Sequence, residues 1–416
     1  MRIRQRLDKL KALNFSLIDQ IITSGSNFFG TLIIVKLLGL NVFGIFSAFW
    51  ILLLFISTIF VSSIISPMMA IIPGCQNIKK YIGSLLIFQL VFSFGAFIVS
   101  FLIALFYFKI SAIETPIKTT VIFSFCVLFH HLQEFFRKYF FAMKVFLNAI
   151  IIDSITYLIR FILLFILFYL ENDTGLNTVF LIYLSTSLLG SIYGICKYKF
   201  EIDSSCIKKD YILHLNISKW LIPSGLLKWS STNLFLVSTS ILLGPVSLGI
   251  IKLSQNIISV YNLFLLGLEN FIPLETARVY SHSGLASLLT YIKKVALNGV
   301  IFTLVFGGLV ALFSSTIIEV TYGENFTQYS YILYWFASCL IFMYLNSIIN
   351  IFLITINKTK ITFQSYVYTS FFSCIIFYPL IYYFEITGVL AGMFCSYVFL
   401  VLISLKQINK NRYDIR

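Results

Sequence analysis

Two short stretches of this sequence decide how its apolar segments are organised: LLGLNVFGI at residues 37–45 and LLGPVSLGI at residues 242–250. Each stretch lies between two long apolar runs, and each carries two glycines five residues apart. Glycine permits the tight turn and the close approach of helices that such a joint requires. The repeat, at a spacing of 205 residues, therefore predicts two related halves, each with a pair of helices joined by such a turn.

The rest of the chain consists largely of apolar runs that are long enough to cross a lipid bilayer. Hydrophobic residues make up 59% of the 416 residues and charged residues only 11%, whereas a soluble domain is about 25% charged. This composition excludes an ordinary globular enzyme and a disordered chain. Because a membrane helix needs about 20 mostly apolar residues, we expect about twelve of them, near residues 15–38, 43–66, 82–108, 118–140, 147–169, 178–196, 217–243, 247–271, 295–317, 330–356, 361–383 and 387–405.

These segments predict an all-α, polytopic membrane protein with two pseudo-symmetric six-helix bundles. Six spans per half is an even number, so both halves insert with the same orientation, and a pseudo-two-fold axis along the membrane normal relates them. Such an arrangement predicts a central cleft between the bundles. We assign residues 1–200 to the N-terminal bundle and residues 201–416 to the C-terminal bundle, with a cytoplasmic linker near residues 197–216.

The distribution of basic residues predicts the orientation in the membrane. With the N-terminus inside, 24 of the 30 Lys and Arg residues fall in the inner segments, and the outer loops hold only Lys109 and Lys118. The positive-inside rule requires such a split, so we expect both termini in the cytoplasm. The basic start, MRIRQRLDKLK at residues 1–11, precedes a long span without a small-residue cleavage pattern, which indicates a retained first helix. The net charge of +14 therefore reports orientation and implies no nucleic-acid partner.

No pattern for catalysis or for cofactor binding is readable in the sequence. The seven cysteines are scattered and never form C-x-x-C, so neither a disulfide framework nor a thiolate zinc site is indicated. The sequence also lacks the motifs of P-loop ATPases, zinc proteases and nucleophile-elbow hydrolases. We therefore predict no catalytic residue, no metal and no cofactor, and we expect the helices themselves to carry the function.

Polar residues with helical spacing run along three of the predicted spans. Superposing the halves at the repeat spacing aligns a polar stripe on the first span with one on the seventh, and the eighth span carries its own. Polar faces on membrane helices must meet protein or water, so we expect these spans to line the cleft. The alternative is that these groups join helices inside each bundle. The candidates for the cleft, beside Arg160, are Asn27, Lys228, Ser231, Lys252, Gln255 and Asn262.

Eight ionisable residues lie inside the predicted spans, where each unpaired charge costs at least about 2.5–3.5 kcal/mol. Arg160 and Lys228 are the strongest candidates for a patch in the cleft that attracts anions. Lys36, in contrast, lies close enough to the outer interface to extend its amine into water. The cations lie at mid-depth or nearer the outside, and they are Lys36, Arg160, Lys228 and Lys252.

The acids within the spans lie toward the cytoplasmic ends and are candidates for ion coupling or for ion pairs. Glu134 and Glu269 have cytoplasmic Lys and Arg residues nearby as partners. Asp153 and Arg160 are seven residues apart on one helical face, too far for direct pairing. His130 is a candidate for a proton relay beside Glu134, with hydrogen-bonded packing as the alternative. The four acids are Asp19, Glu134, Asp153 and Glu269.

Several fragments occur in a recognisable order along nearly the whole chain. They are the two glycine-containing turns, a loop before the tenth span, an amide within that span and a small-residue run opening the twelfth: residues 37–45 and 242–250, Tyr322–Phe326, Asn346, and Gly388–Gly392. In these fragments the chain resembles the polysaccharide (O-antigen type) flippases of the multidrug/oligosaccharidyl-lipid/polysaccharide exporter superfamily. Two positions depart from the family pattern, because Ile251 stands where a tyrosine is usual and Asn357-Lys358 replaces a glycine.

The resemblance implies a flippase of the bacterial cytoplasmic (inner) membrane. Such proteins move an undecaprenyl-diphosphate-linked oligosaccharide, the repeat unit of an O-antigen or other surface polysaccharide, from the cytoplasmic to the outer leaflet by alternating access. A partly cationic cleft suits the diphosphate. We expect a monomer whose partners are this glycan lipid, the bilayer and other proteins of polysaccharide export or polymerisation.

Two alternative functions stay open at this point. A cation-coupled multidrug antiporter of the same superfamily would need buried acids at mid-depth, where this sequence has cations. A membrane polysaccharide polymerase or glycosyltransferase would need a large outer loop or an acidic metal-binding loop. For the latter the chain offers only the short acidic segment at residues 171–173.

Overall fold

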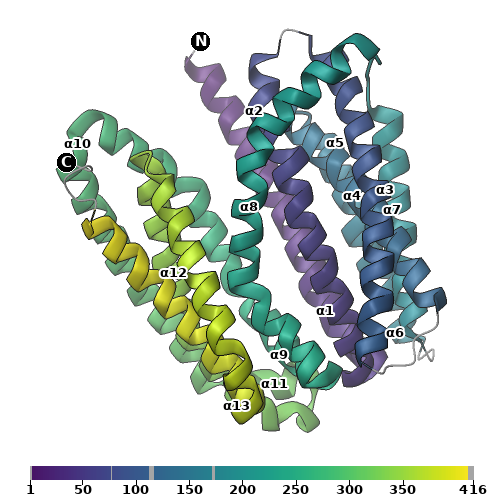
Figure 1. Cartoon of the computed structure of the whole chain (residues 1–416), viewed down its shortest axis with the longest axis vertical. Coiled ribbons are helices and arrows are strands. Elements are labelled where there is room, and N and C mark those ends of the chain that lie inside the picture. The colour runs from purple at the N-terminus through teal and green to yellow at the C-terminus, as the bar shows by residue number, and fades with distance from the viewer. Residues whose placement is uncertain (1, 76, 112–116, 171–173, 411–416) are drawn as a thin grey trace. The chain divides into compact units, whose positions relative to one another are not determined.

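The computed structural model of the chain describes residues 2–75, 77–111, 117–170 and 174–410, without the side chains of 2–18, 73, 110–111, 204–205 and 269–271. Within the described ranges every regular element is a helix (Figure 1), which confirms the all-α expectation. Seven of the described helices are long and apolar enough to cross a membrane, as a multi-pass membrane protein requires. The short acidic segment at residues 171–173 lies outside the described residues.

The contacts within the chain divide it into two compact units, Met1–Leu226 and Leu227–Arg416, called unit 1 and unit 2 below. The division falls within the long helix α8 (Ser204–Leu242), so the first part of α8 belongs to unit 1 and the remainder to unit 2. The assignment of six whole spans each to residues 1–200 and 201–416 stays a prediction.

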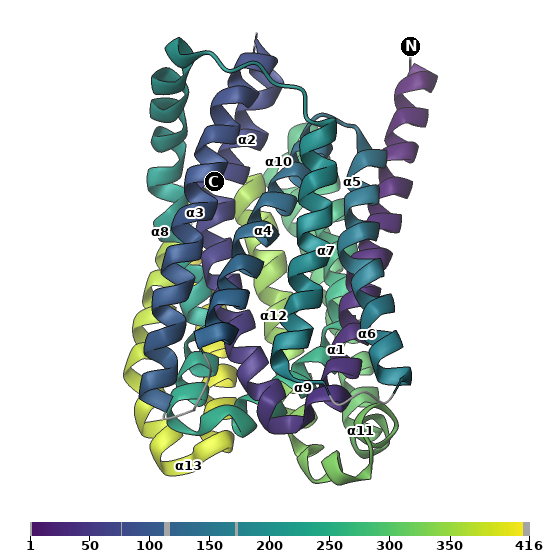
Figure 2. The same ribbon diagram turned by 90° about the vertical axis from the view of Figure 1, so that its right-hand side faces the viewer.

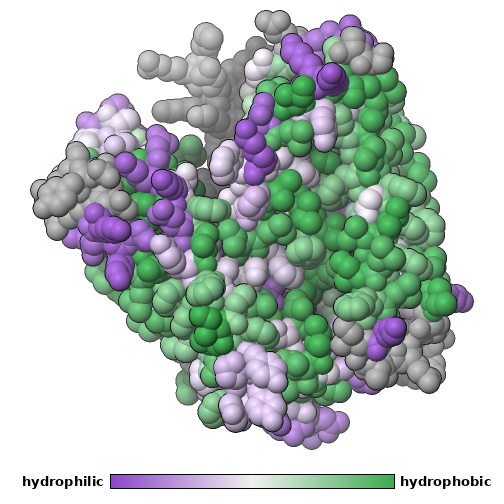
Figure 3. Space-filling model, viewed as in Figure 1, coloured by the Kyte–Doolittle hydropathy of each residue, from purple (hydrophilic) through white to green (hydrophobic). Residues whose placement is uncertain are grey.

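In unit 1, α4 packs between α3 and α7, and α1 packs against α5 and α6 (Figure 2). Apolar side chains cover much of the visible face of this unit (Figure 3). Two π-helical turns, η1 and η3, interrupt otherwise continuous helices. The elements that precede α8 are α1 (Arg2–Phe60), η1 (Val61–Ile65), α2 (Ser66–Ile71), η2 (Ile72–Gly74), α3 (Ile78–Ser111), α4 (Ile117–Ala142), α5 (Phe146–Asp153), η3 (Ser154–Leu158), α6 (Ile159–Tyr169) and α7 (Leu176–Lys197).

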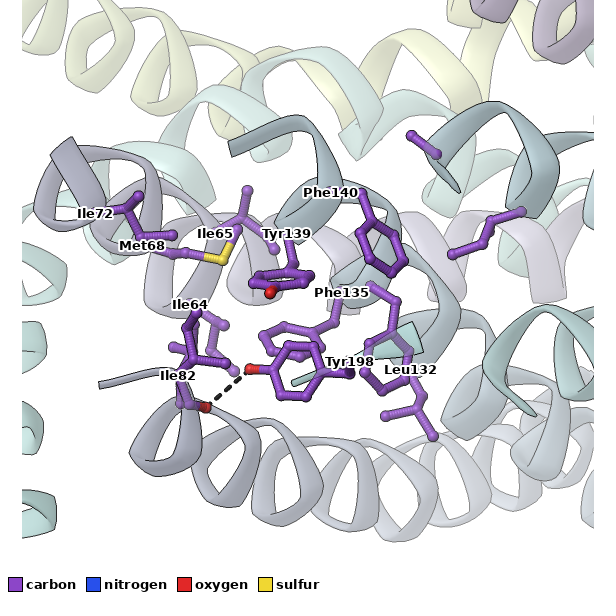
Figure 4. Close-up of a cluster of buried hydrophobic side chains, with 14 of the residues drawn as sticks. Ile64, Ile65, Met68, Ile72, Ile82, Leu132, Phe135, Tyr139, Phe140 and Tyr198 are labelled. Atoms are coloured by element: carbon purple, nitrogen blue, oxygen red, sulfur yellow. Dashed lines mark hydrogen bonds between the residues drawn. The ribbon is translucent and has the colours of Figure 1, made fainter. Parts of the chain in front are cut away.

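One buried cluster of unit 1 is built on aromatic side chains of α4. Phe135 and Phe136 are fully buried, and Met68 from α2 packs into the same cluster (Figure 4). The hydroxyl of Tyr198, which follows α7, donates a hydrogen bond of 2.8 Å to the backbone carbonyl of Ile82 in α3. This cluster fixes α4 against its neighbours and so positions the polar side chains that α4 carries.

In unit 2, α12 is the central helix and packs against α9, α10 and α13. Fully buried Leu288, Leu353 and Tyr344 anchor two clusters between α10 and α12. The elements that follow α8 are α9 (Gly244–Ile258), α10 (Val260–Leu312), α11 (Ser314–Tyr322), η4 (Glu324–Tyr329), α12 (Tyr331–Thr355) and α13 (Thr359–Lys410).

Sharp kinks divide the longest helices into pairs of spans. The helices α1, α10 and α13 hold 59, 53 and 52 residues, whereas one span needs about 20. The kinks of α1 and α13 lie at Gly39 and Glu385, where the expected spans meet. In α10 the kink lies at Gly284. In the two repeated stretches, Gly39 has a φ of 68° and Gly244 a φ of 84°. These left-handed conformations, which favour glycine, confirm the tight turns expected from the sequence.

The π turn η3 changes the expected geometry between Asp153 and Arg160. A π turn takes more residues per turn than an α-helix, so the two side chains are rotated away from the positions they would have on a straight helix. Asp153 contacts α4, whereas Arg160 contacts α7. The two residues therefore have different partners, and they do not share one stripe of a straight helix.

Candidate functional site

Arg137 of α4 lies at the centre of a buried cluster of three carboxylates. Its Nη2 lies 2.8 Å from Asp19 Oδ2 of α1, and its Nη1 lies 3.2 Å from Glu134 Oε2 one turn earlier in α4. Its Nε lies 2.7 Å from Asp153 Oδ1 at the end of α5. The four side chains are at most 14% exposed. We call these residues the Arg137 cluster.

A second layer of hydrogen bonds holds Glu134 in place. The hydroxyl of Tyr157, in the π turn η3, donates to Glu134 Oε1 at 2.9 Å, and Gln133 Nε2 donates to the same oxygen at 3.2 Å. Thr156, also in η3, donates to Gln133 Oε1 at 3.2 Å. The π turn thus brings two successive side chains to α4, and the network ties α1, α4 and α5 together.

The Arg137 cluster contains more acidic than basic groups. Three carboxylates contact one guanidinium, and Asp19 Oδ1 is buried without a hydrogen-bond partner among the described residues. Buried charges need pairing and hydrogen bonds to be tolerated. The excess of acids makes the cluster a candidate for holding a proton, whereas no group of acids, histidines and cysteines among the described residues is placed to hold a metal ion.

Arg160 of α6 is a buried cation of a different kind. Only 3% of it is exposed, and no carboxylate of the described residues pairs with it. Its Nε and Nη2 each donate to a hydroxyl of α7 at 3.2 Å, Thr186 Oγ1 and Ser187 Oγ. Its Nη1 is buried and has no hydrogen-bond partner in the described part of the chain.

Aromatic rings surround the guanidinium of Arg160. It lies 3.9 Å from the ring centroid of Tyr183 and 5.4 Å from that of Tyr157. The Tyr183 ring contacts Trp50 of α1, with the centroids 5.7 Å apart. A guanidinium that stacks on a ring keeps its N–H edge available for hydrogen bonds to the oxygens of an anion such as a phosphate.

The ring of His130, on α4, lies among other rings. Its centroid is 6.3 Å from that of Trp50 and 5.5 Å from that of His131. His131 is fully buried, and its ring nitrogens lie 3.1 Å from Ser57 Oγ and 2.7 Å from the Val127 carbonyl. A proton relay through His130 stays a prediction.

The candidates in unit 2 lie along α8, α9 and the start of α10. Lys228 is exposed, Lys252 and Gln255 are half-buried, and neither lysine pairs with an acid of the described residues. Ser231 is buried, and its hydroxyl donates to the Lys228 carbonyl of its own helix at 2.8 Å. Asn262 is exposed. Their role in a cleft stays a prediction.

Three further candidates lie apart from these groups. Asn27 of α1 is exposed, and its backbone carbonyl accepts a hydrogen bond of 2.8 Å from Thr31. Lys36 is exposed, and its Nζ lies 6.0 Å from the ring centroid of Phe168. The side chain of Glu269 lies outside the described part of the chain.

Arg137 was not predicted as a site residue, because its position near the end of the fourth span placed it with the cytoplasmic cations. The signal for it is its spacing from Glu134, since residues three apart on a helix are neighbours. The hydroxyl groups of Thr186 and Ser187 were not predicted either, because nothing in the sequence indicates which helix packs on Arg160.

Solved structures of known proteins are similar to this chain in fold at low sequence identity. No protein-family model and no curated protein matches the sequence. An inward-facing multidrug resistance MATE family transporter of the MOP superfamily is similar with a TM-score of 0.76 and 12% identity, over 97% of this chain and 98% of that one. The lipid II flippase MurJ, in an inward closed conformation, is similar with a TM-score of 0.74 and 15% identity, over 95% and 87%.

A third similar structure is that of a mutant of the Vibrio cholerae MATE transporter VcmN. Its TM-score is 0.67 and its identity 12%, over 99% of each chain. The similarity covers nearly the whole of each of these proteins, so it concerns the complete set of helices and not a single bundle. This chain therefore has the MATE-like fold that these transporters and MurJ share.

Proposed function

We propose that this protein is a flippase that moves a polyprenyl-diphosphate-linked oligosaccharide from the cytoplasmic to the outer leaflet by alternating access. The observation that carries the proposal is Arg160, a buried guanidinium with no carboxylate partner among the described residues and an unpartnered Nη1. An intramembrane cation without a counterion is costly, and such residues generally serve a substrate or an ion. A diphosphate supplies the missing counterion.

The remaining cations of the spans agree with this cargo. Lys228 and Lys252 also lack an acidic partner in the described part of the chain. Guanidinium and ammonium groups bind phosphate oxygens through charge-assisted hydrogen bonds. Other polar side chains of the predicted cleft are suited to hydrogen bonds with sugar hydroxyls, and they are Asn27, Ser231, Gln255 and Asn262.

The fold supports a flippase without choosing the cargo. MurJ, which shares the fold, is a lipid II flippase. We extend its class of activity, movement of a lipid-linked molecule between leaflets, to this chain because of the unpaired cations. The resemblance in sequence supports a surface-polysaccharide repeat unit as the glycan and the bacterial inner membrane as the location.

The test is transport by the purified protein in liposomes, with a fluorescent polyprenyl-diphosphate oligosaccharide in the inner leaflet. Arg160→Ala or Lys228→Ala is expected to lower the rate of flipping at least about tenfold, the effect of losing one strong charged contact. Lys36→Ala is the matched control, because it removes a cation that we expect to lie near the outer interface and not in the cleft. Wild-type rates in the Arg160→Ala, Lys228→Ala double variant would contradict the proposal.

A cation-coupled multidrug antiporter is the second candidate function, and the Arg137 cluster favours it. One of the three buried carboxylates around Arg137 is a candidate for carrying a coupling proton, and MATE transporters share the fold. The same liposomes distinguish the two functions. Uptake of a cationic dye driven by a proton or sodium gradient, without movement of the glycan lipid, would favour the antiporter.

A further inference from the structure

We infer that the leading segment of α8, residues 206–220, lies in the membrane interface and binds the anionic headgroups of phospholipids. This segment belongs to unit 1, in which the helix packs along one side only.

One side of this segment is docked on α3 and on the π turn η1. His214 is buried, with its Nε2 2.6 Å from the Tyr81 hydroxyl and its Nδ1 3.4 Å from the Ser63 carbonyl. Ser218, one turn later, donates to the same carbonyl at 3.1 Å. At Gly225 the helix comes so close that an added Cβ would lie 2.7 Å from a side-chain oxygen of η1. The rotational position of the segment is therefore fixed.

The opposite side combines apolar and basic side chains. Trp220 is 71% exposed and Ile212 is 49% exposed. Lys208, Lys209 and Lys219 are exposed on the same side, since positions that are half a turn away from His214 recur every three to four residues. Tryptophans at the level of the headgroups and lysines that extend to them are both typical of a helix at the membrane interface.

The three lysines of this face are free to attract anions, because none of them pairs with an acid of the described residues. Two neighbouring acids are paired elsewhere, since Glu201 lies 3.5 Å from Lys79 Nζ and Asp203 lies 2.7 Å from Lys80 Nζ. A third, Asp210, lies on the docked side of the helix, one turn before His214. Figure 3 shows hydrophilic residues gathered near the start of α8, beside the broad apolar surface of unit 1.

Phospholipid headgroups fit this face better than a soluble anion does. A dissolved phosphate or diphosphate would neutralise the lysines but leave Trp220 and Ile212 in water. A lipid surface covers both kinds of side chain at once, and lysines near an anionic leaflet each add to the attraction. The positive-inside prediction places this segment at the cytoplasmic leaflet.

The experiment measures, by native mass spectrometry of the full chain, the affinity for phosphatidylglycerol relative to phosphatidylcholine. The variant Lys208→Gln, Lys209→Gln, Lys219→Gln is expected to lower the preference for phosphatidylglycerol by about tenfold or more. The matched control is Lys293→Gln, Lys294→Gln, which removes two exposed lysines of α10; it is expected to keep the preference.

Two further measurements make each outcome decisive. Sodium pyrophosphate at millimolar concentration is expected not to displace phosphatidylglycerol, and displacement would show a site for soluble phosphate instead. Trp220→Ser, with all lysines kept, is expected to weaken retention of both lipids, because it removes apolar contact; unchanged retention would count against an interfacial position. An unchanged preference in the triple variant, or an equal loss in the control, would overturn the inference.

Discussion

Arg137 and Arg160, both in unit 1, differ in the partners that surround them. Arg137 contacts three carboxylates, whereas Arg160 contacts two hydroxyls and an aromatic ring. An arginine enclosed by acids compensates their charge and contributes to structure. An arginine without an acidic partner is available to bind an anion that is not part of the protein. We therefore expect different roles for the two residues, although both are buried arginines.

Removing the Arg137 side chain is expected to destabilise the protein strongly. Arg137→Ala leaves three buried carboxylates without their cation, and breaking a buried pair in this way costs about 3–5 kcal/mol. The loss is measured as a fall in the midpoint of thermal unfolding in detergent. Arg278→Ala is the control, because Arg278 is exposed and lies 3.9 Å from Glu275, and such pairs contribute about 0–1 kcal/mol. Equal midpoints for both variants would contradict the role of the cluster.

Two conservative variants of Arg137 separate the effect of its charge from the effect of its size. Arg137→Lys keeps the positive charge but contacts fewer carboxylates, because an ammonium lacks the planar fork of the guanidinium. Arg137→Gln keeps hydrogen-bonding capacity and loses the charge. The unfolding midpoint of Arg137→Lys should lie between those of the wild type and Arg137→Gln. Equal midpoints for the two variants would show that the cluster does not depend on charge.

At the scale of the element, the repeated turns were predictable from the sequence and the π turns were not. Gly39 and Gly244 stand at equivalent places in a visible repeat, and both have the left-handed backbone. The turn η3 leaves no comparable pattern, because a single extra residue in a helix does not alter its apolar composition. The partners of Asp153 and Arg160 depend on that turn, so the sequence could not show them.

Gly244→Ala is expected to destabilise the joint between α8 and α9. A side chain at a φ of 84° costs about 1–2 kcal/mol, which lowers the midpoint of thermal unfolding. Gly308→Ala in α10 is the matched control, since Gly308 has ordinary helical geometry and open space around an added Cβ. A control that is as unstable as Gly244→Ala would show that backbone conformation is not the cause.

The docking of α8 on α3 is expected to weaken in acid. Burial lowers the pKa of His214 below its ordinary value, which is about 6.5 in an unfolded chain. As the pH falls below about 6.5, the unfolded chain binds a proton that the folded chain refuses, so stability decreases until the lowered pKa is reached. The midpoint of thermal unfolding should therefore fall as the pH is lowered from about 8 to about 5.5. The Ser63 carbonyl and Asp210 oppose this lowering of the pKa. The variant His214→Gln should remove the dependence of the unfolding midpoint on pH.

At the scale of the whole molecule, the membrane topology stays a prediction from the sequence. In a cysteine-free background, a membrane-impermeant thiol reagent added from outside should label a cysteine introduced near residue 173 and should miss one at Lys208. The positive-inside split among 30 Lys and Arg residues is the reason for this expectation. Labelling at Lys208 but not near residue 173 would reverse the orientation.

The overall fold was predictable because a lipid bilayer limits the secondary structures that an apolar segment can adopt. Apolar runs of sufficient length can only be helices in a bilayer, and the repeat indicated that two halves are related. The candidate site was harder to predict. Arg160 was recognised as an expensive charge, but Arg137 was placed with the loop cations, because a sequence does not show how deeply the end of a helix is buried. Similarity to solved structures then shows the fold alone, and the proposed cargo rests on the charges.

The most direct test of the flippase proposal compares two lipids in the same proteoliposomes. One is a fluorescent polyprenyl-diphosphate oligosaccharide, and the other is the same polyprenol and oligosaccharide joined without phosphate. We expect the wild-type protein to move the diphosphate lipid much faster than the phosphate-free lipid, and we expect Arg160→Ala to abolish this difference while the protein stays folded. Equal movement of both lipids by the wild type, or a preference that survives in Arg160→Ala, would contradict the proposal.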